Sequence, residues 1–284
     1  MQTMNLIIQA PDIATAALKH LHIISKAANI AAIQGMSHQV FSLSSADIST
    51  KVAVAQYCET EKLDFGFVQA DKKLSDYKLL AMDMDSTVIT IECIDEIADF
   101  INKKAEVAAI TEAAMRGEID WPQSLRQRVA LLASLPASTL ETVYEQRLKL
   151  TPGASKLVAA AQVAGLKTVV VSGGFTFFTS RLRARLKLDY AFSNELEIID
   201  GKLTGQVLGA LCDANAKAAH VQAIAAQLSA TKEQIITIGD GANDLAMMAV
   251  SGTSIAYHAK PKVLEQAHYA LNHVDLSGVL ALLS

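Results

Sequence analysis

The chain has 284 residues, of which 51% are hydrophobic, and it carries 25 basic against 29 acidic side chains. At roughly 150 residues per domain, this length predicts about two domains with buried cores and excludes a disordered or low-complexity chain. The net charge of −4 lacks the basic excess of a nucleic-acid or anionic-membrane surface, so neither partner is expected. The apolar runs stay below the roughly 18 residues that a membrane-spanning helix needs.

The three cysteines, Cys58, Cys93 and Cys212, are odd in number and form no CxxC pair. They indicate neither a disulfide framework nor a zinc site, and a reducing compartment is then the default. The first residues lack the basic start, the long apolar run and the small-residue cleavage site of a signal peptide. We therefore expect a cytoplasmic protein.

Residues 1–75 alternate strand and helix patterns as a small unit of their own. The predicted elements are a strand at 5–9, a helix at 13–28, strands at 30–34 and 39–43, a helix at 48–61 and a strand at 64–69. This βαββαβ order is typical of a ferredoxin-like α+β fold and is similar to ACT-like regulatory modules. The unit is expected to act as a small-molecule sensor, or as a dimerisation or packing domain that would form a homodimer. The polar residues 71–78 predict a linker.

Residues 76–284 follow a different pattern, in which short apolar strands alternate with helices. The predicted elements are strands at 79–82 and 168–171, a helix at 176–186, a hairpin turn at 200–201, a helix at 214–228, a strand at 235–238, a helix at 244–250 and a strand at 253–257. They predict a doubly wound (Rossmann-like) parallel sheet covered on both faces. Residues from about 90 to 150 contain helical patterns only and predict an inserted all-helical cap, with one helix starting at Asp120 and Pro122.

Polar residues follow the predicted strands of this second unit. Residues 83–87, 172–174 and 239–244 each come directly after a strand, and Lys217 lies near the start of a helix. Because ligands of parallel sheets bind at the carboxyl ends of the strands, these residues should border one crevice. Taken singly, each segment could be turn, capping or surface chemistry; their joint occurrence in this order favours a functional site.

The residue types at this crevice suit phosphoryl chemistry. Clustered carboxylates repel one another unless a hard cation such as Mg²⁺ binds them. A serine beside two glycines and a lysine suits a phosphoryl group. Asp83 can attack phosphorus, and Asp85, two residues later, can pass a proton to the leaving group and then accept one from water.

Four segments carry a family resemblance: DMDST at 83–87, VVSGGF at 170–175, Lys217, and GDGANDLAMM at 239–248. They resemble the four signature motifs of the haloacid dehalogenase (HAD)-type phosphohydrolases, and their amino-acid sequences are similar to those of the phosphoserine phosphatase family. The similarity spans about residues 78–284. It implies Mg²⁺-dependent hydrolysis of O-phospho-L-serine to L-serine and phosphate through an aspartyl-phosphate intermediate, the last step of L-serine biosynthesis.

The resemblance also implies roles for individual residues. Asp83 would be the nucleophile, and Asp85 the general acid and then the general base. The Asp83 carboxylate, the Asp85 backbone carbonyl and Asp240 would hold Mg²⁺. The phosphoryl oxygens would be bound by three groups: the Ser172 hydroxyl, the Gly173 N–H and Lys217. The remaining two roles are those of Asn243, which would reach the substrate side of the phosphate, and Asp244, which would orient Lys217 or a metal-bound water.

Glu92 and Arg128 match the cap residues that recognise the amine and the carboxylate of the substrate in this family. Each also has a plain alternative, Glu92 as a first-turn helix charge and Arg128 as a solvated helix residue. The alternative function is a HAD phosphatase or phosphotransferase that acts on another small phosphomonoester, which would not need this charge pair. A phosphate-storing signalling receiver lacks the cap and the second aspartate, and the intact motifs speak against a catalytically dead sensor.

Overall fold

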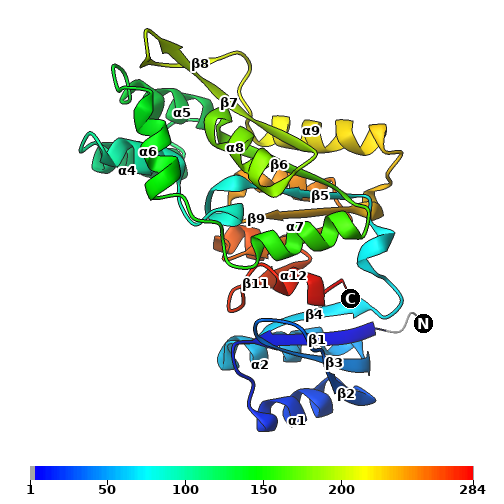
Figure 1. The fold of residues 1–284 in the computed structure, drawn as a ribbon. Helices are drawn as coiled ribbons and strands as arrows, with labels where there is room; N and C mark the ends of the chain where they lie inside the picture. Colours follow the sequence, from blue (N-terminus) through cyan, green and yellow to red (C-terminus); the bar gives the residue numbers. More distant parts are fainter. Residues whose placement is uncertain (1–3, 284) are drawn as a thin grey trace.

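Two β-sheets organise the chain, a four-stranded sheet near the N-terminus and a seven-stranded sheet after it (Figure 1). The structure, a computed structural model, describes residues 4–283 except for the side chain of Met115. Residues 1–3 and 284, which the two predicted units include, lie outside the described residues. None of the helices in the described part has the length and apolarity that a membrane span requires.

The first sheet is antiparallel and has the strand order β2-β3-β1-β4. Its elements are β1 (Met4–Ala10), α1 (Thr15–Ile24), β2 (Asn29–Ala32), β3 (Gln39–Ala46), α2 (Lys51–Glu61) and β4 (Asp64–Gln69). The predicted βαββαβ order is therefore confirmed. Successive strand residues point to opposite faces: Leu6 and Ile8 pack in the core with α1 and α2, whereas Ile7 belongs to the core of the second sheet.

The second sheet has the strand order β11-β10-β9-β5-β6-β7-β8. Its strands are β5 (Leu79–Met82), β6 (Lys167–Phe175), β7 (Tyr190–Ile199), β8 (Lys202–Leu208), β9 (Ile235–Gly239), β10 (Thr253–Tyr257) and β11 (Tyr269–Leu271). Neighbouring strands are parallel except β7 and β8, which form a hairpin. Asp200 and Gly201 both have positive φ values, 50° and 73°, as the predicted two-residue turn requires.

Helices cover both faces of this sheet, which confirms the doubly wound fold. The helices are α7 (Ala154–Val163), α8 (Thr176–Leu186), α9 (Ala214–Gln227), α10 (Leu245–Ala249), α11 (Pro261–Leu264) and α12 (Gly278–Ala281). Apolar residues of α7 and α8 pack on one face, and those of α9 and α10 on the other. The chain order of the strands reverses at β5, and the carboxyl ends of β5, β6 and β9 therefore border a crevice.

The segment between β5 and β6 forms an all-helical cap, as predicted. It consists of α3 (Cys93–Asp99), α4 (Lys104–Met115), α5 (Trp121–Ala130) and α6 (Ser138–Gln146). The start of α5 has the predicted chemistry, because the Asp120 carboxylate accepts a hydrogen bond of 2.7 Å from the Gln123 N–H and Pro122 stands in the first turn. In Figure 1 the cap lies at the end of the sheet opposite the N-terminal unit.

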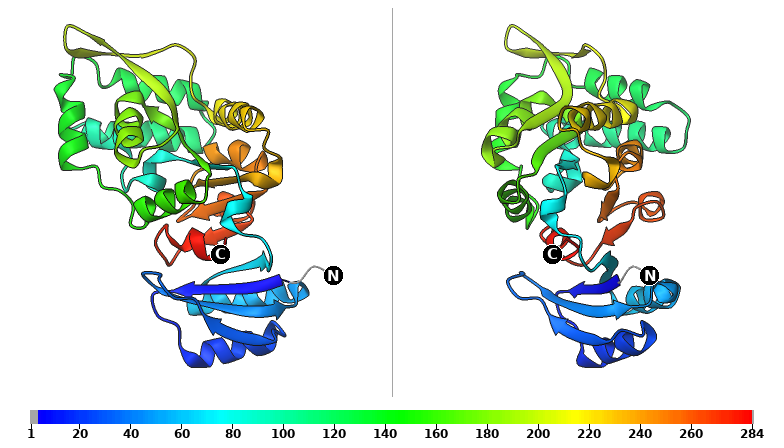
Figure 2. Two further views of the ribbon diagram at one scale, coloured as in Figure 1. Left: turned by 45° about the vertical axis from the view of Figure 1, so that its right-hand side comes forward. Right: turned by 90° about the vertical axis from the view of Figure 1, so that its right-hand side faces the viewer.

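The first sheet packs against the C-terminal segment of the chain (Figure 2). Its face opposite α1 and α2 contributes Ile7, Val40 and Val68 to a core shared with α7 and α12. The Asp64 carboxylate on β4 accepts hydrogen bonds from the backbone N–H groups of three consecutive residues after β11, 272–274, at 2.8, 2.8 and 3.1 Å. The two sheets are thus joined by packing and by hydrogen bonds.

Several element boundaries differ from the predictions. The helix predicted at 13–28 spans only Thr15–Ile24, and the strand predicted at 168–171 continues to Phe175. The predicted linker is anchored, because Tyr77 is buried and its hydroxyl lies 2.8 Å from that of Thr253. Strand β11 was not predicted, since three residues are too few for a periodic pattern.

Candidate active site

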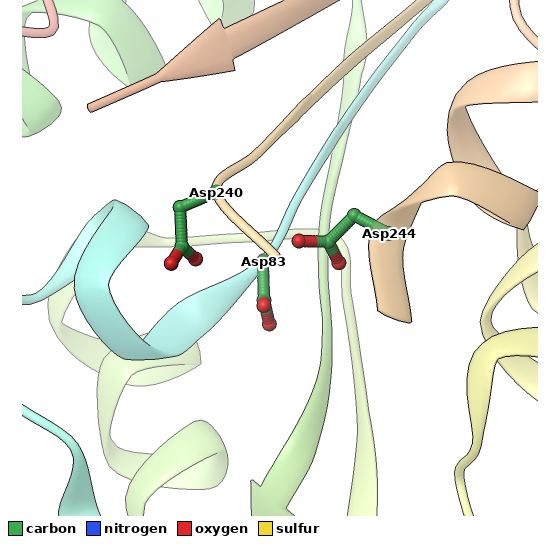
Figure 3. A group of neighbouring side chains, drawn as sticks. All are labelled: Asp83, Asp240 and Asp244. Carbon is green, nitrogen blue, oxygen red and sulfur yellow. The ribbon is translucent and has the colours of Figure 1, made fainter. Parts of the chain in front are cut away.

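Buried strands deliver the acidic side chains to one point. All four residues of β5 have no exposed surface, and Asp83 follows at its carboxyl end. Asp240 follows β9, and Asp244 stands one turn later in the same loop. Figure 3 shows the three carboxylates close together, and one oxygen atom of each lies within 4.8 Å of the other two. The site therefore collects three negative charges at the switch point of the sheet.

One ammonium group lies among these carboxylates. Lys217, on the first turn of α9, is fully buried, and its Nζ lies 2.9 Å from Asp83 Oδ1 and 2.8 Å from Asp244 Oδ1. Burial opposes a charge on Lys217, but the charges of Asp244 and Asp83 outweigh it and raise the pKa of the lysine. The Gly241 N–H also donates to Asp244, at 3.1 Å. A side chain at position 239 would collide with the Asp244 carboxylate, which explains the glycine there.

The single ammonium of Lys217 does not neutralise all the carboxylates of this site. Burial, followed by the charge of Asp244, raises the pKa of Asp83. Burial, followed by the charges of Asp244 and Glu92, raises the pKa of Asp240 to about 7. A hard cation with oxygen ligands would relieve this repulsion, and carboxylates are the donor type that Mg²⁺ takes. The donor set therefore fits a divalent metal.

Asp85 lies between the sheet and the cap. Its Oδ1 accepts a hydrogen bond of 3.1 Å from the backbone N–H of Cys93, the first residue of α3. A Cβ atom on Gly174 would lie only 2.7 Å from Asp85 Oδ2, so the glycine leaves room for the carboxylate. Burial, followed by the nearby charge of Glu92, raises the pKa of Asp85 to about 7. A carboxyl group with this pKa can both donate and accept a proton near neutral pH.

The end of β6 forms the opposite side of the crevice. Pairing between β6 and β7 becomes irregular between Val171 and Phe175. Within this irregular stretch, Ser172 is fully buried, and its hydroxyl accepts a hydrogen bond of 2.8 Å from the Gly174 N–H. The stretch brings a hydroxyl and glycine backbone close to the carboxylates, which suits an anionic ligand.

Two charged residues come from the cap side. Glu92 precedes α3, and its Oε1 accepts a hydrogen bond of 2.7 Å from the Ser86 hydroxyl. Arg128 on α5 donates from Nε to the Ser124 carbonyl at 3.4 Å, and among the described residues no carboxylate oxygen lies within 4.0 Å of its guanidinium. A partly buried guanidinium without such a partner is suited to bind a carboxylate or a phosphate.

These groups enclose a cavity of about 110 Å³. Eight of the ten predicted site residues line it, namely Asp83, Asp85, Glu92, Arg128, Ser172, Gly173, Asp240 and Asn243. The other two, Lys217 and Asp244, are joined to Asp83 as described above. Apolar walls come from Ile94, Trp121, Leu125 and Phe175. Sequence reasoning assigned no role to Ser86, although it stands inside the first motif, because its bond to Glu92 depends on how the chain turns after β5.

Comparison with known proteins agrees with this arrangement. A sequence profile of the haloacid dehalogenase-like hydrolases matches residues 80–249. The chain is 55% identical over 217 residues to the phosphoserine phosphatase of Polaromonas sp., covering 75% of this chain and 92% of that protein.

Two solved structures extend the similarity to the whole chain. The chain matches the structure of a HAD family hydrolase from Salmonella enterica serovar Typhi with a TM-score of 0.91 and 30% sequence identity. The match covers 100% of this chain and 99% of that protein chain. It matches a probable phosphoserine phosphatase from Vibrio cholerae with a TM-score of 0.83 and 38% sequence identity. This match covers 98% of this chain and 86% of that protein chain. The chain thus belongs to the haloacid dehalogenase-like hydrolases and, within them, to the enzymes of the phosphoserine phosphatase family.

Proposed function

We propose that this chain is a Mg²⁺-dependent phosphatase that hydrolyses O-phospho-L-serine to L-serine and phosphate through an aspartyl-phosphate intermediate. One observation carries the proposal. A single small cavity has phosphoryl-binding chemistry on the sheet side, and on the cap side it has Glu92 and Arg128, whose guanidinium has no carboxylate partner among the described residues. A substrate that carries a phosphate, an ammonium and a carboxylate matches both sides.

In the first step, an Asp83 oxygen attacks phosphorus and forms an acyl phosphate while the bond from phosphorus to the serine oxygen breaks. Asp85, in its protonated form, gives its proton to the departing oxygen, so that L-serine leaves as a neutral alcohol. The Ser172 hydroxyl, the Gly173 N–H and Lys217 hold the oxygens of the transferring group. Asn243 lies on the substrate side of this group.

In the second step, water attacks the phosphorus of the aspartyl phosphate, and Asp85 accepts a proton from it. The bond between phosphorus and Asp83 then breaks, which releases phosphate and restores the carboxylate. The Asp83 carboxylate, the Asp85 carbonyl and Asp240 would hold Mg²⁺, which supplies positive charge against the phosphoryl oxygens. Asp244 keeps Lys217 directed at Asp83 through its bond of 2.8 Å.

A substrate panel with the purified protein tests this function. With Mg²⁺ present, phosphate release from O-phospho-L-serine should exceed that from a sugar phosphate, a nucleotide and p-nitrophenyl phosphate by about tenfold or more in kcat/KM. Similar values across the panel would favour a HAD phosphatase for another small phosphomonoester. Treatment with EDTA should abolish turnover and added Mg²⁺ should restore it, whereas full activity in EDTA would contradict the proposed cofactor.

We further propose that residues 1–75 form a regulatory or dimerisation domain and that the chain forms a homodimer through it. Strand β2 supports this proposal, because it is an edge strand and all four of its residues are exposed. Light scattering should then give a dimer mass for the wild type and a monomer mass for Ile30→Lys. The control Val163→Lys, on α7, should remain a dimer. A monomeric wild type would contradict this assembly.

We also propose a cytoplasmic location. The three cysteines of the chain are free and buried. Free thiols are typical of proteins in a reducing compartment.

A further inference from the structure

Asn194 on β7 connects two parts of the active site that are far apart in the sequence. Its side chain is 1% exposed. Its Nδ2 donates a hydrogen bond of 2.7 Å to the Gly173 carbonyl, and its Oδ1 accepts one of 2.8 Å from the Cys212 N–H. Both hydrogen-bonding groups of one buried amide are thus engaged with backbone.

The bond to Gly173 replaces one that the sheet does not provide. Asn194 pairs with Phe175 in the register of β6 and β7, and the register is irregular between Val171 and Phe175. In this stretch the strand leaves its ladder, and the carbonyl of Gly173, which is partly buried, takes another donor. The Asn194 amide supplies that donor and fixes the Gly173–Gly174 peptide unit. The adjoining Ser172–Gly173 peptide carries the Gly173 N–H, which faces the phosphoryl position in the proposed mechanism.

The bond to Cys212 fixes the start of α9. Asp213, the next residue, caps this helix by accepting 2.8 Å from the Ala216 N–H. Lys217 follows on the first turn of the helix and reaches Asp83. A change at the Cys212 peptide would therefore move the base of the helix that carries the lysine.

We propose that Asn194 is a positioning residue for phosphoryl transfer. It holds the Gly173 carbonyl and the start of α9 at a fixed separation, so that the Ser172–Gly173 segment and Lys217 stay arranged around Asp83. The assigned roles of these groups rest on the proposed function. An asparagine suits this position because its short side chain offers one donor face and one acceptor face.

Asn194→Asp is the sharpest test, because it preserves the shape and the acceptor for Cys212 but removes the donor to Gly173. With p-nitrophenyl phosphate, kcat/KM should fall by about 10- to 100-fold, the effect expected for a small misplacement of binding groups. The inhibition constant of orthovanadate, which occupies the phosphoryl position, should rise by a similar factor. That of L-serine should stay within about twofold, as expected for a site without shared partners.

Gln9→Glu is the matched control. It makes the same amide-to-acid change in a fully buried side chain on β1, and kcat/KM should not change even if stability falls. A folded Asn194→Asp variant with wild-type vanadate inhibition and kcat/KM would overturn the proposal. An equal loss of vanadate and L-serine binding would also overturn it, because it would indicate general disruption of the site.

A measurement on the wild type decides the matter if the variant does not fold. The side-chain amide resonances of Asn194 should shift in NMR spectra when orthovanadate binds, whereas those of Gln9 should not; an unshifted Asn194 amide would contradict the proposal. The readouts with p-nitrophenyl phosphate and orthovanadate are independent of the substrate assignment, whereas the comparison with L-serine rests on it. If the protein failed to hydrolyse phosphoserine, the measurements with p-nitrophenyl phosphate and orthovanadate would still decide the role of Asn194.

Discussion

At the residue scale, the charge balance around Lys217 governs the site. Two carboxylates, Asp83 and Asp244, share its single ammonium, and Asp240 adds a third negative charge nearby. Buried charges are costly unless they are paired. The excess of carboxylates therefore suits a cation, and in the proposed mechanism Lys217 would keep its bond to Asp244 when Asp83 reacts with substrate.

Asp83→Asn should abolish turnover and leave the protein folded. The amide cannot form the acyl phosphate, so kcat should fall by about 10⁴-fold or more. Stability should change little, because Lys217 keeps its bond to Asp244. Steady-state kinetics and thermal unfolding followed by circular dichroism check both statements. Substantial remaining activity would assign the nucleophile to another group.

Arg128→Ala should impair the hydrolysis of phosphoserine selectively. Loss of a charge-assisted contact to the substrate carboxylate should lower kcat/KM for phosphoserine by about 10- to 100-fold. Hydrolysis of p-nitrophenyl phosphate, which has no carboxylate, should change much less. Arg126→Ala is the matched control, because Arg126 is an exposed residue of the same helix, and it should keep wild-type kinetics. An equal loss with both substrates would contradict the specificity role.

At the element scale, secondary structures bring distant residues together by their ends. Strands β5 and β9 end just before Asp83 and Asp240, and helix α9 carries Lys217 on its first turn. The packing of α9 on the sheet includes a stacked pair, His220 over Phe192, with ring centroids 4.0 Å apart. The position of the lysine therefore depends on apolar and aromatic packing along the whole helix.

His220 makes the packing of α9 sensitive to pH. Burial lowers the pKa of His220 from its usual value of 6.5. The unfolded chain then binds the proton more readily, so the stability contributed by the neutral ring is lost as the pH falls below 6.5.

Urea unfolding at about pH 7.5 and about pH 5 should therefore reveal a loss of stability in the wild type relative to His220→Phe, which keeps an aromatic ring but does not titrate. The free energies of unfolding of the two proteins should diverge as the pH decreases. Identical pH dependence in both proteins would exclude His220 as the titrating group.

At the scale of the whole molecule, the N-terminal sheet is built into the rest of the chain. The face of this sheet that its own helices leave uncovered packs against α7 and α12, and Asp64 binds three consecutive backbone N–H groups after β11. This face of the N-terminal sheet therefore stabilises the segment that follows β11. The exposed β2 edge lies elsewhere on the same sheet.

Asp64→Asn should loosen this junction. The amide presents an N–H group to backbone donors, which should lower the free energy of unfolding by about 1–3 kcal/mol. Urea denaturation measures this loss, and kcat should remain near the wild-type value because the junction follows the edge strand β11, two strands away from β9 and the active site. Asp12→Asn, at an exposed carboxylate of the same unit, should leave stability unchanged. Equal stability of Asp64→Asn and wild type would contradict the junction.

Much of the fold was predictable because its signals are local. Strand 79–82 is a short apolar run, helix α5 has Asp120 as its N-cap and Pro122 in its first turn, and the hairpin turns at Asp200 and Gly201. These features depend on side-chain patterning and on backbone preferences of neighbouring residues. Strand β11 was too short for a periodic pattern, and the buried position of Tyr77 depends on Thr253, which is far away in the sequence.

The sequence by itself determined which groups are available for chemistry and in what order they occur, since motif spacing and strand ends are local properties. The tertiary structure alone decided that Asp244 shares Lys217 with Asp83, that Ser86 holds Glu92, and that Asn194 joins Gly173 to Cys212. Each of these contacts spans separate turns or separate elements. Their geometry follows from how helices and strands pack, which no local pattern encodes.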